Sequence, residues 1–282
     1  MKRSILIHVA QSLLNANPRR VDVRPFASLL TPVLKGIIVS LLILAAGARL
    51  APGEDCNALV LQQVRDMPVG GNYSVSHVAK IRLQSAAHFE SGKFFVLPSS
   101  ASPSFCSGAT YLVFIRTIED LRASGQLQLD FPTLDQLMIR NQRDGEGIWG
   151  RWNANGPGTA RLFHELGIGR NFTSFAEARP GDFMKIFWSD KVGRTESGHS
   201  VIFLGTENRD GVEYVRFWSS NIPAGYGEKS VPRTKIACAI FSRLEKPSNL
   251  TRINSAPAVD EYLASLLRKN SSFAEATRKS GI

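Results

Sequence analysis

The sequence predicts an α+β fold in which one long helix precedes a meander of antiparallel strands. Two observations predict it. Apolar residues recur at helical spacing after residue 104, and runs rich in β-branched and aromatic residues, separated by turns, follow after residue 180. With 282 residues, 43% of them hydrophobic and 21% charged, the chain suffices for one globular domain with extensions.

Residues 1–48 predict a targeting segment. An uncharged apolar run over residues 36–47 follows Lys35, and Ala46-Gly47-Ala48 is typical of a signal-peptide cleavage site. The run is shorter than the ~20 apolar residues that a bilayer-spanning helix needs. This favours a cleaved signal peptide with a long basic region over a retained anchor. We therefore expect a secreted or periplasmic protein that meets a membrane only through an uncleaved signal segment.

The formal net charge of +10 is shared unevenly along the chain. Residues 1–48 hold six of the 34 Lys and Arg residues and one acid, so residues 49–282 keep an excess of five positive charges. There is no run of five like charges and no interleaving of aromatic and basic residues, so nucleic-acid binding is not expected. The sequence also lacks metal-binding, phosphate-loop and dinucleotide-binding motifs, so we expect no metal and no cofactor. We expect the protein to be a monomer.

The helix of the predicted core begins close to Cys106, with Ser104 as its N-cap, and runs to about Ser124 before Gly125. Its apolar positions are Tyr111, Phe114, Ile115, Ile118 and Leu121. The predicted strands cover residues 183–188, 200–204, 212–218 and 234–241. The core thus spans residues 104–245 and follows an N-terminal helical or loop extension over residues 49–103.

An insertion over residues 125–172 separates the core helix from the strands. It contains a glycine-rich stretch, residues 141–158, that predicts a long loop, and a short helix over residues 159–166. After the core, residues 246–282 predict a C-terminal helix and, beyond Lys269, a polar tail. The apolar face of that helix is Val259, Tyr262, Leu263, Leu266 and Leu267.

Cys106 is the candidate nucleophile. A thiol reacts as its thiolate, and the N–H groups at a helix N-terminus favour that anion. Ser107 and Gly108 follow with little bulk, so backbone N–H groups can also face a developing oxyanion. The alternative is a small structural cysteine at the start of a helix, which is common for a lone cysteine.

His199 is the candidate general base. It stands between Gly198 and an apolar run, where a histidine can project into a groove while its strand stays anchored in the core. A third group must orient the imidazole. The following strand ends in Ser219-Ser220-Asn221, and antiparallel pairing brings this end near His199. Alternation does not choose among these three residues; Asn221 is preferred, with Ser219 and Ser220 as rivals.

These residues, in this order, resemble the core of NlpC/P60-type enzymes. The resemblance rests on Cys106-Ser107-Gly108 at a helix start, Pro180-Gly181-Asp182-Phe183 before a strand, and Gly198-His199 opening an apolar strand, and it covers roughly residues 104–221. It implies a papain-like fold with the nucleophile-bearing helix packed on an antiparallel sheet. It also implies a cysteine peptidase or amidase acting on peptidoglycan or other peptides. By this match Cys106, His199 and Asn221 are catalytic and Asp182 is the structural motif aspartate.

The glycine-rich insertion offers residues for a substrate wall. Trp149 and Trp152 present ring faces, Arg151 suits a carboxylate, and Asn153 and Asn155 suit amide groups. A rigid surface loop whose tryptophans fill the core is an equally good interpretation.

Two other functions stay open from the sequence. The same Cys–His pair can serve an acyltransferase, and a structural cysteine would leave a non-catalytic module that binds the cell wall or a partner. The remaining cysteines, Cys56 and Cys238, are a possible disulfide pair in an exported protein.

Overall fold

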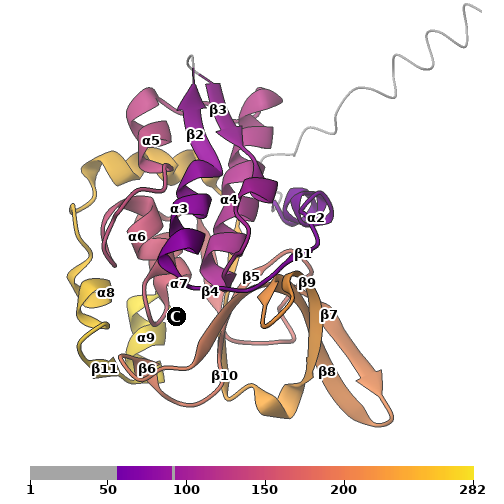
Figure 1. Cartoon of the computed structure of the whole chain (residues 1–282). Helices are drawn as coiled ribbons and strands as arrows, with labels where there is room; N and C mark the ends of the chain where they lie inside the picture. The colour runs from indigo at the N-terminus through magenta and orange to yellow at the C-terminus, as the bar shows by residue number, and fades with distance from the viewer. Residues whose placement is uncertain (1–55, 91–92) are drawn as a thin grey trace, which may run out of the picture. The chain divides into compact units, whose positions relative to one another are not determined.

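The computed structural model describes residues 56–90 and 93–282, which belong to one compact unit, Ala48–Ile282. The fold is α+β, with helices and an antiparallel sheet (Figure 1). The predicted signal segment, residues 1–48, lies outside the described residues. Within them, no helix combines the length and the apolar character needed to cross a bilayer.

The main sheet has seven strands in the order β1-β9-β8-β7-β5-β10-β4, and all of its pairings are antiparallel. In chain order the strands are β1 (Gly70–Gly71), β4 (Gly169–Phe172), β5 (Phe183–Phe187), β7 (Gly198–Arg209), β8 (Val212–Asn221), β9 (Gly225–Pro232) and β10 (Cys238–Leu244). The predicted strands match β5, β7, β8 and β10, although β7 and β8 run further than expected. The long β7–β8–β9 ladder carries the candidate residues His199 and Asn221.

The helix that starts at the candidate nucleophile, α4 (Cys106–Ala123), lies against β7 and β8. Successive strand residues point to opposite faces of a sheet, so each strand contributes side chains to a hydrophobic core on each face. The core on the α4 face includes Phe183, Ile202 and Trp218. The core on the other face includes Met184, Val201 and Phe217. With a core on both of its faces, the sheet is a firm support for residues at the strand ends.

The N-terminal extension is built into the same body. It consists of α2 (Asn57–Arg65), α3 (His77–Ser85), the hairpin of β2 (Ala87–Glu90) and β3 (Lys93–Val96), and the short 3-10 helix η1 (Pro98–Ser100). Helix α2 packs against α4, and β1 joins the sheet edge beside β9. The extension therefore helps to fix the position of α4.

The insertion is more helical than the sequence predicted. It folds into α5 (Phe131–Gln136), α6 (Gly147–Asn153) and α7 (Gly158–Leu166), so the prediction of a long loop over residues 141–158 was wrong. The glycines of this stretch indicated a loop, but Gly150 is required for close packing within a helix. A Cβ at this position would lie 2.2 Å from the carbonyl oxygen of Arg143. Beside it, the apolar side chains of Ile148, Trp149 and Trp152 are buried and stabilise α6.

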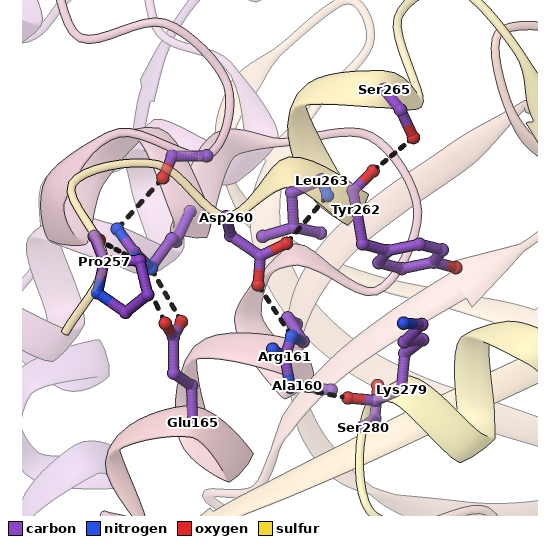
Figure 2. Close-up of polar contacts among 12 residues, drawn as sticks. Ala160, Arg161, Glu165, Pro257, Asp260, Tyr262, Leu263, Ser265, Lys279 and Ser280 are labelled. Atoms are coloured by element: carbon purple, nitrogen blue, oxygen red, sulfur yellow. Dashed lines mark hydrogen bonds and ion pairs between the residues drawn. The ribbon is translucent and has the colours of Figure 1, made fainter.

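The tail after Lys269, which the sequence predicted to be polar, forms regular structure. The C-terminal segment contains η3 (Pro247–Ser255), α8 (Glu261–Ser265), β11 (Asn270–Ser271) and α9 (Phe273–Lys279), and β11 pairs with β6 (Val192–Gly193). Polar contacts fasten it to α7: Asp260 accepts from Arg161 Nε at 2.7 Å, and Arg161 also donates to the Lys279 carbonyl at 3.1 Å (Figure 2). Hydrophobic periodicity alone does not predict long-range polar contacts such as those of Arg161.

Cys56 and Cys238 do not form the disulfide considered from the sequence. The Cys56 N–H donates to the carbonyl of Leu244 at 2.9 Å, whereas Cys238 begins the same strand. At about 3.3 Å per residue, the length of β10 puts roughly 20 Å between the two cysteines, and a disulfide tolerates a Cα separation of at most about 7 Å.

Candidate active site

Cys106 is the first residue of α4, and its side chain is partly exposed. Phe105 is the N-cap and supplies no side-chain hydrogen bond. The prediction of Ser104 as N-cap was wrong, because its hydroxyl donates instead to Ser220 Oγ at 2.8 Å. The N–H groups of a first helical turn have no acceptor within the helix. At Cys106 they are left available to an anion because no capping side chain occupies them.

His199, the second residue of β7, hydrogen-bonds to the Cys106 thiol. Burial by itself raises the pKa of Cys106, but the hydrogen bond and charge of His199 and a hydrogen bond from the Ser200 N–H lower it more, and the result is a pKa of about 7 instead of 9.0. The positive charge of Lys185 acts in the same direction. A large fraction of this thiol is therefore ionised near neutral pH.

Asn221 ends β8 and holds the imidazole of His199. Its Oδ1 lies 3.0 Å from His199 Nε2, while its Nδ2 donates to the carbonyl oxygens of Ser219 at 3.2 Å and Gly227 at 2.8 Å. Carbonyl oxygens only accept, so they fix which end of the amide faces the histidine. Oδ1 must then accept a hydrogen bond from the Nε2–H group, and Nδ1 keeps the lone pair that can take a proton from the thiol.

The rivals of Asn221 have other roles. The Ser219 hydroxyl donates to the carbonyl of Ser200 at 2.7 Å, and Ser220 accepts from Ser104. Ile202 pairs with Trp218 across β7 and β8, and continuing this antiparallel register sets Asn221 opposite His199. Strand pairing therefore selects the third residue, a choice that the sequence alone left open.

Cys106 opens onto a pocket of about 690 Å³. Its lining comes from residues in and around α3, from Phe105 and Trp149, from β5, from the start of β7 and from the residues around the end of α6. Polar lining residues include Asp144, Asn153, Asn155, Lys185, Glu196 and Ser200. The volume is that of a small-molecule or peptide site.

Comparison of the chain with protein-family models, curated proteins and solved structures gave no match. Among residues 56–90 and 93–282, no cluster of three or more His, Cys, Asp or Glu side chains is arranged to hold a metal ion.

Four of the residues predicted to surround the substrate do line this pocket: Ser107, Trp149, Asn153 and Asn155. The Ser107 hydroxyl donates to Asn153 Oδ1 at 2.6 Å and so joins the start of α4 to the end of α6. Gly108 does not line the pocket. It is buried against Leu83, whose Cδ2 would lie 2.8 Å from a Cβ at this position.

Arg151 and Trp152 do not reach the pocket, and their predicted roles in substrate binding were wrong. Arg151 is fully buried and ion-paired to Glu165 at 2.7 Å, and its guanidinium also donates to the carbonyl oxygens of Gly145, Gly147 and Pro257. The Trp152 ring stacks on Phe114 with a centroid distance of 4.8 Å. In α6 these side chains lie on the side that faces the core.

Asp182 has the structural role that the sequence assigned to it. It is completely buried and accepts from the Arg179 N–H at 2.7 Å, which closes the turn before β5. Arg243 on β10 donates to both carboxylate oxygens, at 2.8 and 2.7 Å, and Asn57 of α2 donates at 2.9 Å. This network joins the turn, the sheet and the N-terminal extension.

Sequence reasoning missed Tyr73, Lys185 and Glu196, which also line the pocket. Burial raises the pKa of Tyr73 to about 12, and so do the charge of Cys106 and a hydrogen bond between the two side chains. Tyr73 lies far from the nucleophile in the chain and carries no motif. Lys185 had a detectable signal, because it is the one charged residue in the apolar run Phe183–Phe187.

Proposed function

We propose that this chain is a cysteine hydrolase that cleaves amide bonds through Cys106, His199 and Asn221. The observation that carries the proposal is the hydrogen-bonded series from thiol to imidazole to amide. The Cys106 thiol is hydrogen-bonded to the imidazole of His199, whose Nε2 lies 3.0 Å from Asn221 Oδ1. Nucleophile, base and orienting group in this relation are what covalent acyl transfer requires. A cysteine with a purely structural role needs no such series.

In the proposed reaction the Cys106 thiolate attacks the amide carbonyl and the carbonyl oxygen becomes negatively charged. His199, having taken the thiol proton on Nδ1, returns it to the leaving amine. Water then attacks the thioester, with the same imidazole as base, and releases the acid product. The Asn221 amide keeps the ring in one orientation throughout, because both of its ends are engaged.

The developing oxyanion has two sources of stabilisation close to the sulfur. The N–H groups of the first turn of α4 lie at the end of the helix that carries Cys106. The Tyr73 hydroxyl hydrogen-bonds to the Cys106 side chain. The high pKa of Tyr73 keeps this hydroxyl protonated, and therefore a donor, at neutral pH.

The proposed substrate is a peptide of bacterial cell-wall peptidoglycan, and the proposed place of action lies outside the cytoplasm. Support for the substrate comes from the resemblance of residues 104–221 to NlpC/P60-type enzymes. The packing of α4 against β7 and β8 supports the proposal of the papain-like core that this resemblance implies. The apolar run at residues 36–47 supports export.

Digestion of purified cell-wall sacculi by residues 49–282, with mass analysis of the soluble fragments, tests this function. The matched control is Cys106→Ser, which keeps the size of the side chain and removes the thiol. We expect peptide fragments with the active protein and none with the variant. Fragment release that is equal in both would refute the assignment of Cys106, and release by neither would refute the wall substrate.

A further inference from the structure

An ion pair lies in the pocket beside the thiol. Lys185 Nζ on β5 is 2.8 Å from Glu196 Oε1, and both side chains are largely buried, with 15% and 6% of their surfaces exposed. An ion pair removed from water to this degree carries a desolvation cost. Unlike the buried pairs Arg151–Glu165 and Arg243–Asp182, this pair lines the pocket onto which Cys106 opens, which suggests a role in the site.

Glu196 is fixed in position by backbone hydrogen bonds and does not move with the Lys185 side chain. Its second oxygen, Oε2, accepts from the N–H of Gly156 at 2.5 Å and from the N–H of Gly193 at 2.8 Å. Gly156 follows α6, and Gly193 belongs to β6, which pairs with β11 of the C-terminal segment. The carboxylate therefore joins the segment after α6 to β6 and presents its other oxygen to Lys185 from a fixed point.

The lysine side chain lies along the backbone just before the candidate base. A Cβ at Gly198 would lie 2.9 Å from Lys185 Cε and 3.0 Å from its Nζ, so glycine at this position leaves room for the ammonium. Lys185 is paired in register with Ser200, the residue whose N–H hydrogen-bonds to Cys106. The ammonium is thereby fixed in the pocket onto which Cys106 opens.

We propose that Lys185, held in place by Glu196, is a positioning residue that stabilises the thiolate of Cys106 through its charge. The role deepens the proposed function and rests on it in so far as the thiolate is the nucleophile. Lys185 makes no bond to the reacting atoms in this arrangement. It favours the anion by Coulomb attraction in a site that is partly shielded from water, as its lowering effect on the pKa of Cys106 indicates.

Other groups face the thiol and the ion pair from neighbouring elements. They are Tyr73 before α3, Lys80 on α3, Asp144 before α6, His199 on β7 and Tyr262 on α8. None of them is changed in the variants below. A difference between variants therefore reports the ion pair itself.

The test is the pH dependence of iodoacetamide labelling, measured on the peptide that contains Cys106 so that the other cysteines do not contribute. Lys185→Met should move the labelling midpoint to higher pH and slow labelling at pH 6 roughly three- to tenfold. Lys185→Arg keeps the charge and should stay within about twofold of the wild-type rate at that pH. Lys191→Met removes an exposed charge nearby and should leave the profile unchanged.

The double variant Lys185→Met/Glu196→Gln leaves no buried charge without a partner, so it serves if the single variant does not fold. It should show the same shift to higher pH. A wild-type profile in the folded single or double Met variant would overturn the proposal. So would an Arg variant as slow as the Met variant, because packing rather than charge would then be the cause. This readout needs no hydrolysis, so a wrong substrate would not be mistaken for a wrong ion pair.

Discussion

Asn221 holds His199 by a single contact, 3.0 Å from Oδ1 to Nε2, while two backbone carbonyls hold the other end of the same amide. This relationship determines which ring nitrogen carries the proton and therefore which one can act as base. It also explains why the last residue of β8 matters as much as the strand that carries the histidine.

Replacing Asn221 with alanine should lower the rate of amide cleavage about 10- to 100-fold, because the imidazole loses its preferred orientation and tautomer. The fold should be retained, since the sheet register does not depend on this side chain. Rates of fragment release from sacculi measure the effect. Asn208→Ala, at the exposed end of the β7–β8 hairpin, is the control and should keep the wild-type rate.

Tyr73→Phe removes one hydroxyl beside the sulfur. We expect kcat to fall roughly tenfold with little change in KM, because the lost hydrogen bond acts on the oxyanion and not on the bound substrate. Steady-state kinetics with an isolated wall peptide would show this division. An effect on KM alone would assign Tyr73 to substrate binding instead. Tyr214→Phe, on the distant part of β8, provides the comparison.

Asp182→Asn should destabilise the fold by about 3–5 kcal/mol, because it removes a buried carboxylate that accepts from the guanidinium of Arg243, from Asn57 and from the Arg179 N–H. Urea unfolding measures the loss. The contrasting change is Glu228→Gln, which breaks the exposed pair with Arg216 at 3.1 Å and should cost about 0–1 kcal/mol. Equal costs for the two variants would contradict the structural role of Asp182.

Two neighbours in α6 should behave in opposite ways. Trp152→Ala removes a core side chain with 2% exposure and should lower the free energy of unfolding by about 3–5 kcal/mol. Asn153→Ala changes a residue that lines the pocket, so it should raise KM while the unfolding free energy changes by no more than about 1 kcal/mol. If Asn153→Ala destabilised the protein and left KM unchanged, the assignment of Asn153 to the substrate pocket would be contradicted.

The sequence predicted the fold class, the helix from Cys106 to Ser124 and most of the strands, because their apolar patterns follow the periods of helix and strand. It could not choose among Ser219, Ser220 and Asn221, since only the register between β7 and β8 decides which of them meets the histidine. A strand pattern gives the faces of a strand and leaves its pairing undetermined.

The substrate wall shows why residue type is a weak guide to position. Arg151 and Trp152 are suited to binding but point into the core, whereas Asn153 reaches the pocket. The difference arises because residues 147–153 form a helix, in which adjacent side chains point in different directions. Tyr73 and Glu196 escaped detection because long-range packing, not local sequence, brings them to the sulfur.

The most direct test of the central claim is the pH profile of Cys106 labelling by iodoacetamide in the wild-type protein and in His199→Ala. In the wild type the rate should rise with a midpoint near pH 7, because the folded structure lowers the pKa of this thiol to about 7. Without the imidazole the midpoint should move to higher pH, towards the ordinary thiol range of about 8.5. Identical profiles in the two proteins, or a wild-type thiol that stays unreactive below pH 8, would contradict the account.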